Sequence, residues 1–191
     1  MTQKQLSLLG AEPELPEGFK YQPDIVTPEE ELGLLGCIRE LPFKEFEFHG
    51  FLGKRRVVYY GWRYNFTEQM VQEADDIPPW LLPLREHAAE FAGIAPASLQ
   101  QVLVTEYAPG AAIGWHRDKA VFGDVIGVSL VSSCVFRLRR KGGAKWERAS
   151  LQAEPRSAYL LRGPSRTEWE HSIPPVDTLR YSITFRNLLQ P

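Results

Sequence analysis

Residues 101–138 decide the fold of this chain, and they read QVLVTEYAPGAAIGWHRDKAVFGDVIGVSLVSSCVFRL. Short runs rich in β-branched and aromatic residues alternate here with turn signals such as Pro109-Gly110, a pattern typical of β-strands joined by tight turns. Outward from this stretch, the same pattern continues toward the C-terminal end. The predicted strands are Val102–Val104, Val125–Leu130, Cys134–Leu138, Ala158–Leu161 and Tyr181–Phe185.

The N-terminal half predicts an arm followed by helices. Residues 1–26 contain several prolines and are expected to form an extended arm. A helix should begin at Pro28, because Thr27 is a suitable N-cap and Glu30 completes a capping box, and it should end before Pro42. A second helix is predicted over residues 79–91, followed by Gly93 as its C-terminal cap.

Between the two predicted helices, residues 46–64 alternate polar and apolar side chains, which favours a hairpin or a pair of strands. Helices followed by many short strands indicate an α+β, mainly β fold, with supporting helices on one side of a double-sheet jelly roll. The sequence contains no repeat or convincing linker, so we expect one domain over residues 1–191, with a core at 101–188.

The composition excludes several classes of protein. The 22 basic and 24 acidic residues give a net charge of -2, which argues against a globally basic nucleic-acid binder, so any polyanion contact must be local. The two cysteines, Cys37 and Cys134, make a disulfide framework improbable and favour a reducing compartment. Without an apolar leader or a membrane-length run, we expect a cytoplasmic protein, and we expect it to be a monomer.

Three polar residues form the candidate metal site. His116 and Asp118 are two positions apart, so in a strand they would present an imidazole and a carboxylate on the same face. His171 could be brought beside them by an adjacent strand. Two histidines and one carboxylate are the ligand set of non-haem iron(II) oxygenases. The alternative is that these are ordinary polar residues, and His49 and His87 are other possible ligands.

Arginines dominate one face of the last predicted strand. In Arg180-Tyr181-Ser182-Ile183-Thr184-Phe185-Arg186 the residues alternate strictly, so Arg180, Ser182 and Arg186 share one face. Guanidinium groups bind carboxylates bidentately, which predicts a short dicarboxylate between the two arginines. A solvent-facing edge strand would show the same alternation.

Taken together, three blocks of this sequence closely resemble the AlkB family of iron(II)- and 2-oxoglutarate-dependent dioxygenases, which act on alkylated nucleic acids. They are Tyr107-x-Pro109-Gly110-x-x-Ile113-x-x-His116-x-Asp118, then Arg162-Gly163-Pro164-Ser165-Arg166 ahead of His171-Ser172-Ile173, and finally Arg180-Tyr181-Ser182-x-Thr184-x-Arg186. The resemblance implies a double-stranded β-helix, iron held by His116, Asp118 and His171, and oxidative demethylation of N-alkylated nucleobases in DNA or RNA. It also implies that 2-oxoglutarate and O2 are cosubstrates, with Tyr107, Arg180, Ser182 and Arg186 binding 2-oxoglutarate.

The first half resembles the family more loosely. Residues 45–66 fall where such proteins carry a β-hairpin lid that recognises nucleotides. Within this lid the sequence offers a basic cluster for phosphates and three rings, expected to share one face, for stacking on a base; these residues are Lys54, Arg55, Arg56, Tyr60, Trp62 and Tyr64. Packing of the rings in the core and a solvated basic turn are the alternative.

Three positions depart from the family pattern. Ala120 stands where nucleobase demethylases of this family commonly have an acidic residue that contacts the base, so the choice of base is open. Thr105 and Ser182 replace asparagines, but both can still form hydrogen bonds. Alternative functions are therefore a hydroxylase of modified tRNA or protein side chains with the same cofactors, and a non-catalytic nucleic-acid-binding module.

Overall fold

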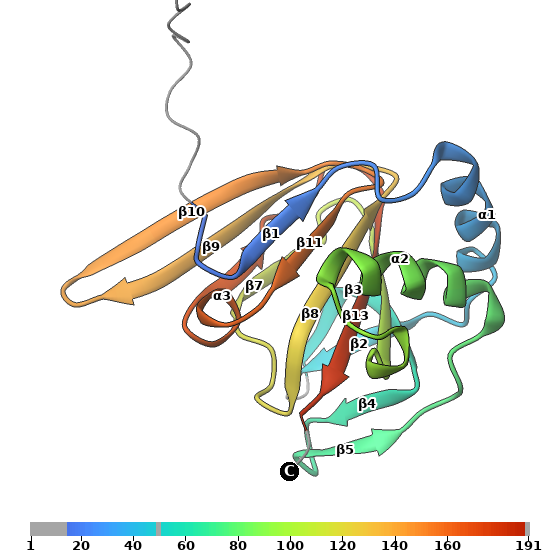
Figure 1. The fold of residues 1–191 in the computed structure, drawn as a ribbon, viewed down its shortest axis with the longest axis horizontal. Helices are drawn as coiled ribbons and strands as arrows, with labels where there is room; N and C mark the ends of the chain where they lie inside the picture. The colour runs from blue at the N-terminus through green and yellow to red at the C-terminus, as the bar shows by residue number, and fades with distance from the viewer. Residues whose placement is uncertain (1–14, 49–50, 190–191) are drawn as a thin grey trace, which may run out of the picture.

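The structure is a computed structural model that describes residues 15–48 and 51–189, and it contains two facing antiparallel sheets (Figure 1). The larger, seven-stranded sheet has the order β1 (Phe19–Gln22), β11 (Ala158–Leu161), β8 (Phe122–Leu130), β13 (Arg180–Leu188), β6 (Gln101–Tyr107), β3 (Phe51–Tyr60) and β2 (Lys44–Phe48). The four-stranded sheet has the order β10 (Lys145–Ala153), β9 (Cys134–Gly142), β12 (Glu170–Ile173) and β7 (Ile113–His116). This confirms the predicted jelly roll with a mainly β composition.

Helices cover the outer face of the larger sheet. They are α1 (Pro28–Ile38), the short 3-10 helix η1 (Pro79–Leu81), α2 (Leu82–Ala92) and the 3-10 helix η2 (Pro96–Ser98). The capping box of α1 is formed as predicted, since Thr27 Oγ1 accepts from the Glu30 amide and the Glu30 carboxylate accepts from the Thr27 amide. Gly93 ends α2 in the left-handed region with φ 67, which a side chain would oppose.

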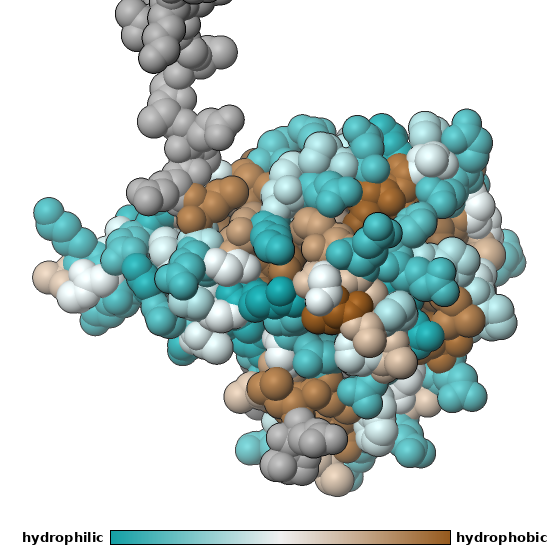
Figure 2. Space-filling model, viewed as in Figure 1, coloured by the Kyte–Doolittle hydropathy of each residue, from teal (hydrophilic) through white to brown (hydrophobic). Residues whose placement is uncertain are grey.

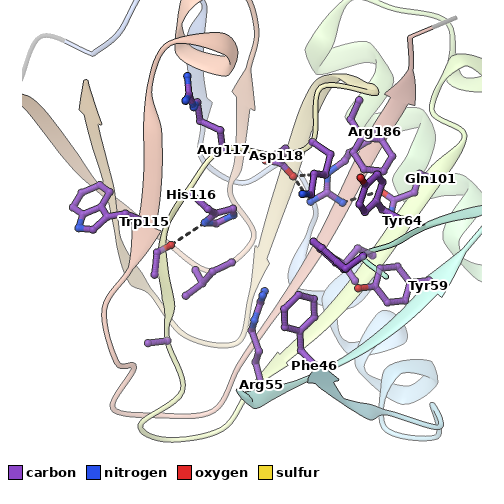
Figure 3. Close-up of a pocket in the computed structure, with 17 residues that line it drawn as sticks. Phe46, Arg55, Tyr59, Tyr64, Gln101, Trp115, His116, Arg117, Asp118 and Arg186 are labelled. Atoms are coloured by element: carbon purple, nitrogen blue, oxygen red, sulfur yellow. Dashed lines mark hydrogen bonds and ion pairs between the residues drawn. The ribbon is translucent and has the colours of Figure 1, made fainter. Parts of the chain in front are cut away.

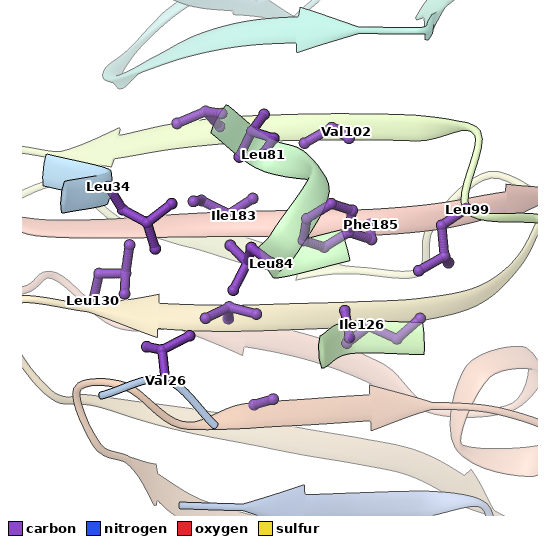
Figure 4. Packing of buried hydrophobic residues seen from close by; sticks show 14 of the residues in the cluster. Val26, Leu34, Leu81, Leu84, Leu99, Val102, Ile126, Leu130, Ile183 and Phe185 are labelled. Atoms are coloured by element: carbon purple, nitrogen blue, oxygen red, sulfur yellow. The ribbon is translucent and has the colours of Figure 1, made fainter. Parts of the chain in front are cut away.

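The helices and the larger sheet share one apolar core. Leu81 and Leu84 pack toward Ile183 and Phe185 of β13, and all four side chains are buried (Figure 4). Because successive residues of a strand point to opposite sides, this packing turns Arg180, Ser182 and Arg186 toward the space between the two sheets. The helical layer therefore determines which face of β13 meets the site.

A second apolar cluster fills part of the space between the sheets. Phe136 of β9 and Tyr159 of β11 lie with ring centroids 4.3 Å apart, and Phe19 of β1 packs against both rings. The remaining space between the sheets holds the candidate site. Within the predicted extended arm over residues 1–26, Phe19–Gln22 are extended and pair with β11 as an edge strand; residues 1–14 lie outside the described residues.

The predicted lid at 45–66 contributes strands to two separate sheets. β2 pairs with β3, whereas a two-stranded sheet forms between β4 (Trp62–Asn65) and β5 (Met70–Glu73). Gly61, with φ 71, separates β3 from β4, so the chain changes direction between Tyr60 and Trp62. The expected continuous alternation of Tyr60, Trp62 and Tyr64 on one face is therefore wrong.

Two further features complete the molecule. The β9–β10 hairpin extends beyond the rest of the domain, and hydrophilic residues cover most of it (Figures 1 and 2). The short helix α3 (Pro164–Thr167) precedes β12. Within the described ranges, no helix combines the length and apolar character that crossing a membrane would require.

Candidate metal centre

Three side chains converge between the sheets to form a candidate metal site. His116 ends β7, and His171 lies directly opposite it in β12, with ring centroids 4.2 Å apart. Asp118 completes the group, and the possible ligand atoms of all three residues lie within 4.8 Å of one another. The sequence prediction of this trio is thus confirmed as a spatial cluster.

The local path of the chain differs from the prediction at one point. β7 ends at His116, so Asp118 lies in the loop that follows rather than on the same strand face. Its position is fixed by an ion pair instead of by strand alternation: Arg186 Nε and Nη2 lie 2.8 and 2.7 Å from Asp118 Oδ1. Asp118 therefore lies beside His116 as predicted, but the ion pair with Arg186 holds it there, not the alternation of side chains along a strand.

The second oxygen of Asp118 shows that the trio fits a cation. Oδ2 is buried and has no hydrogen-bond partner among the described residues, although His171 Nε2 is 3.6 Å away. A buried carboxylate oxygen without a partner is unfavourable unless a cation completes it. Two imidazole nitrogens and one carboxylate oxygen, with further positions left open, match the ligand set of non-haem iron(II).

The histidine that ends β7 is oriented by its own backbone. His116 Nδ1 lies 2.8 Å from the Gly114 carbonyl oxygen, so Nδ1 carries the proton and donates to that carbonyl. This hydrogen bond leaves Nε2 unprotonated and directed at the site. Such a bond to the other ring nitrogen fixes the tautomer of a metal-binding histidine.

The charges of the trio also suit a metal. Burial lowers the pKa of His171 to about 3, with the neighbouring His116 acting in the same direction. Burial likewise lowers the pKa of His116, partly opposed by Asp118. Burial alone would raise the pKa of Asp118, but Arg186 and both histidines hold it well below its usual range. At neutral pH the imidazoles are neutral and the carboxylate is ionised, which is the state that binds a divalent cation.

These pKa shifts predict how stability without metal depends on pH. The unfolded chain protonates His171 below about pH 6.5, whereas the folded protein does so only near about pH 3, so the unfolded state binds more protons in between. The contribution of His171 to stability should therefore be constant above about pH 6.5 and fall as the pH is lowered from there. Urea midpoints measured in a metal chelator at several pH values test this, and replacing both histidines by asparagine should reduce the slope. A urea midpoint that increases as the pH is lowered from about 6.5 to about 5 would contradict this prediction.

Arg180 lies deeper between the sheets and is prepared for an anion. The side chain is 0% exposed; its Nε donates to Ser129 Oγ at 3.1 Å, while Nη1 and Nη2 have no partner among the described residues. The guanidinium lies 5.0 Å from the ring of Tyr107, and Ser182 is buried in the same strand. A buried guanidinium with two unpaired nitrogens fits a carboxylate, which can accept from both.

Arg186, the second of the two arginines predicted to bind the dicarboxylate, already has hydrogen-bond partners within the protein. Besides its contact with Asp118, its Nη1 donates to Gln101 Oε1 at 2.8 Å. Its role in this structure is to orient a metal ligand. Binding of a cosubstrate carboxylate by Arg186 stays a prediction.

A cavity of about 480 Å³ opens next to the trio (Figure 3). Of the six predicted substrate residues, Arg55 and Tyr64 line it, and the other four do not. Lys54 is exposed, Arg56 forms an ion pair with Glu106 at 2.7 Å, and Tyr60 packs against the core beneath the helices. Trp62 is partly buried in β4. The three residues of the predicted basic cluster therefore have different environments: Arg55 lines the cavity, Arg56 is paired with Glu106, and Lys54 is exposed.

Several residues of the cavity wall were not predicted from the sequence. Phe46 and Phe66 meet edge to face at 5.9 Å, and Tyr64 meets Phe66 at 5.2 Å, so three rings form a continuous wall. Lys119 lies over two of these rings, with Nζ 5.0 Å from the centroid of Tyr64. The position of Lys119 directly after Asp118 was a signal that could have placed it at the site. Of the alternative ligands, His87 lies 3.9 Å from Glu30, away from the trio, and His49 is outside the described residues.

Comparison with known proteins gives results consistent with this site. The family model described as the 2OG-Fe(II) oxygenase superfamily matches residues 38–186. An Arabidopsis thaliana protein named alkylated DNA repair protein ALKBH8 homolog is 30% identical over 193 residues, covering 88% of this chain and 54% of that protein. The chain thus spans about half the length of that relative.

Two other similarities extend over most of both chains. The uncharacterized protein L905 of Acanthamoeba polyphaga mimivirus is 29% identical over 189 residues, covering 91% of this chain and 86% of that protein. The solved structure of OsALKBH1 superimposes with a TM-score of 0.66 at 16% identity, covering 91% of this chain and 98% of that one. At that identity the structural similarity supports the fold.

Proposed function

This chain belongs to the 2OG-Fe(II) oxygenase superfamily, and from that premise we propose that it removes N-linked alkyl groups oxidatively from nucleobases of DNA or RNA. It is a 2-oxoglutarate-dependent dioxygenase of the AlkB type, with iron(II) as cofactor and 2-oxoglutarate and O2 as cosubstrates. The proposal extends this chemistry to a substrate and to a role in the repair of alkylation damage.

The aromatic wall of the cavity is the observation that carries the proposal. Phe46, Tyr64 and Phe66 line a space of about 480 Å³ that also reaches His116 and Asp118. A nucleobase is a flat ring, and proteins bind single-stranded or flipped bases by stacking them on aromatic side chains. A base inserted along this wall would place its N-alkyl group beside the metal ligands. The name of the Arabidopsis relative points to the same class of substrate.

Each part of the site has a distinct task in this reaction. His116, Asp118 and His171 would hold iron(II), and Arg186 keeps the carboxylate of Asp118 in one orientation. Arg180 would bind a carboxylate of 2-oxoglutarate through its two unpaired nitrogens. The bound iron, 2-oxoglutarate and O2 supply the oxidising chemistry. The protein contributes alignment of the reacting groups, which accounts for a large share of rate acceleration in enzymes.

Demethylation assays test the proposal directly. Oligonucleotides of DNA and of RNA with single methylated bases are incubated with the protein, iron(II) and 2-oxoglutarate, and formaldehyde and unmodified nucleoside are measured by mass spectrometry. We expect both products in equal amounts. Turnover of 2-oxoglutarate that no oligonucleotide stimulates would instead favour a protein hydroxylase, and absence of any turnover would favour a binding module.

A pair of lid variants tests the role of the aromatic wall. Tyr64→Ala should weaken oligonucleotide binding by about 1–3 kcal/mol, the usual value of stacking one base on an aromatic ring. Trp62→Ala, an aromatic truncation in the same strand but outside the cavity wall, should change binding less. Fluorescence anisotropy with a methylated single strand measures both. Equal losses, or a parallel loss of iron affinity in Tyr64→Ala, would show that the ring acts through folding of the lid.

A further inference from the structure

Positive charge predominates in the wall of the substrate cavity. The cationic residues that line it are Arg55, Arg117, Lys119 and Arg186, whereas Asp118 is the single acidic residue among the lining residues. Asp118 is a metal ligand in the proposed function and is paired with Arg186. The exposed Ala120, two residues further along the chain, supplies no carboxylate.

Two of these cations have no compensating acid. Among the side chains that the structure describes, neither Arg55 nor Lys119 has a carboxylate oxygen within 4.0 Å. Arg55 extends from β3 toward the His116 side of the cavity (Figure 3). Arg117 points away from the cavity and donates to the Thr167 carbonyl oxygen, so its charge contributes less to the field inside the cavity (Figure 3).

The cofactors do not reverse this balance. The two positive charges of iron(II) offset the two negative charges of 2-oxoglutarate, Asp118 offsets Arg186, and the buried Arg180 adds one further positive charge. A substrate base in the loaded enzyme therefore meets the field of Arg55 and Lys119. In a partly buried cavity such charges act over several ångströms, because screening is weaker than in bulk water.

The aromatic wall does not offset the repulsion of a cationic base either. Ring faces attract cations, and this could in principle favour a positively charged base. Here the guanidinium of Arg55 lies 3.8 Å from the centroid of Phe46, and Lys119 Nζ lies 5.0 and 5.1 Å from those of Tyr64 and Phe66. All three rings already interact with a cation of the protein itself.

We infer that the cavity selects alkylated bases without a positive charge, such as 3-methyluracil or 3-methylthymine, over cationic ones such as 3-methylcytosine and 1-methyladenine. The inference rests on the proposed function and narrows its substrate class. A neutral base can lie along the wall, beside the cations that cover its rings, and accept hydrogen bonds at its carbonyl oxygens from Arg55 or Lys119. A cationic base of the same shape has fewer acceptors and is repelled by both residues.

Matched oligonucleotides test this selection. 3-Methyluracil and 3-methylcytosine have nearly the same shape and carry the methyl group on the same nitrogen, but only the second is cationic at neutral pH. We expect kcat/KM to be at least about tenfold higher for the 3-methyluracil strand at low salt, with a smaller ratio at high salt. Faster demethylation of 3-methylcytosine would overturn the inference and leave the proposed function intact. Failure with both strands and with the other methylated bases would overturn the proposed function itself.

A charge reversal separates cavity electrostatics from the intrinsic reactivity of the two bases. Lys119→Glu should lower the ratio of 3-methyluracil to 3-methylcytosine turnover by about tenfold or more. Lys141→Glu makes the same change at an exposed lysine near the tip of the β9–β10 hairpin and should leave the ratio unchanged. Equal ratios in wild type and Lys119→Glu would overturn the inference. If Lys119→Glu folds poorly, Lys119→Gln and Arg55→Gln are expected to shift the ratio in the same direction by a smaller factor.

Discussion

Replacing Asp118 by asparagine is expected to abolish demethylation and to weaken iron(II) binding by at least about a hundredfold. Loss of a residue that merely orients a metal ligand typically costs ten- to a hundredfold in affinity, so loss of the charged ligand itself should cost more. Asparagine keeps an oxygen that can accept from Arg186, which limits damage to the fold. Anaerobic titration with iron(II) measures the affinity, and formaldehyde release measures turnover.

The control for this variant is the same chemical change at a surface carboxylate. Asp24→Asn removes a charge from a side chain that is 73% exposed and lies outside the site, so iron affinity and turnover should be unchanged. Urea unfolding of both variants in a chelator shows whether either change acts through stability. Near-normal iron affinity in a folded Asp118→Asn protein would exclude this residue as a ligand.

Local features of the sequence were sufficient for much of the fold. The start of α1 was predictable because Thr27 and Glu30 satisfy each other's backbone amides within three residues. The turn after β6 was predictable for a similar reason, since Gly110 has φ 81 and the Ala111 amide donates to the Ala108 carbonyl oxygen. In each case the determining contacts lie close together in the sequence.

Other features depended on contacts between distant residues and could not be predicted. The strand at Lys145–Ala153 is exposed over Lys145–Arg148 and shows an apolar alternation only at Ala149, Leu151 and Ala153, and its full length is held as a strand by its pairing with β9. The separation of the lid rings follows from Gly61, whose backbone turns the chain where the side-chain pattern continues. Arg56 is removed from the predicted basic cluster by Glu106, fifty residues further along the chain.

The candidate site contains both a feature that local sequence predicts and a feature that depends on contacts between distant residues. Strict alternation correctly placed Arg180 and Arg186 on the same face of one strand. It could not show that Arg186 would find Asp118 and Gln101 as partners while Arg180 would keep two unpaired nitrogens. Two arginines that are equivalent in the sequence pattern therefore differ in chemistry, and their replacements should have different consequences.

Arg180→Met is expected to raise the KM for 2-oxoglutarate by about thirtyfold or more, because truncating one partner of a buried charge pair costs about 2–5 kcal/mol. Methionine fills a similar apolar volume without the charge. Iron(II) affinity in the absence of 2-oxoglutarate should change little, since Arg180 makes no ion pair with the metal trio. Arg186→Met is the matched comparison, and it should weaken iron(II) binding because Asp118 loses its ion-pair partner.

Thermal unfolding gives a second measurement of the same prediction. Saturating 2-oxoglutarate should raise the Tm of the wild-type protein with iron(II), because a ligand that binds the folded state stabilises it by mass action. The increase should be absent in Arg180→Met. Without cosubstrate, the variant should be at least as stable as the wild type, because the substitution removes a buried cation whose Nη1 and Nη2 have no partner among the described residues. A large loss of stability without ligand, combined with an unchanged KM, would instead make Arg180 a structural residue and would place the cosubstrate carboxylate elsewhere in the jelly roll.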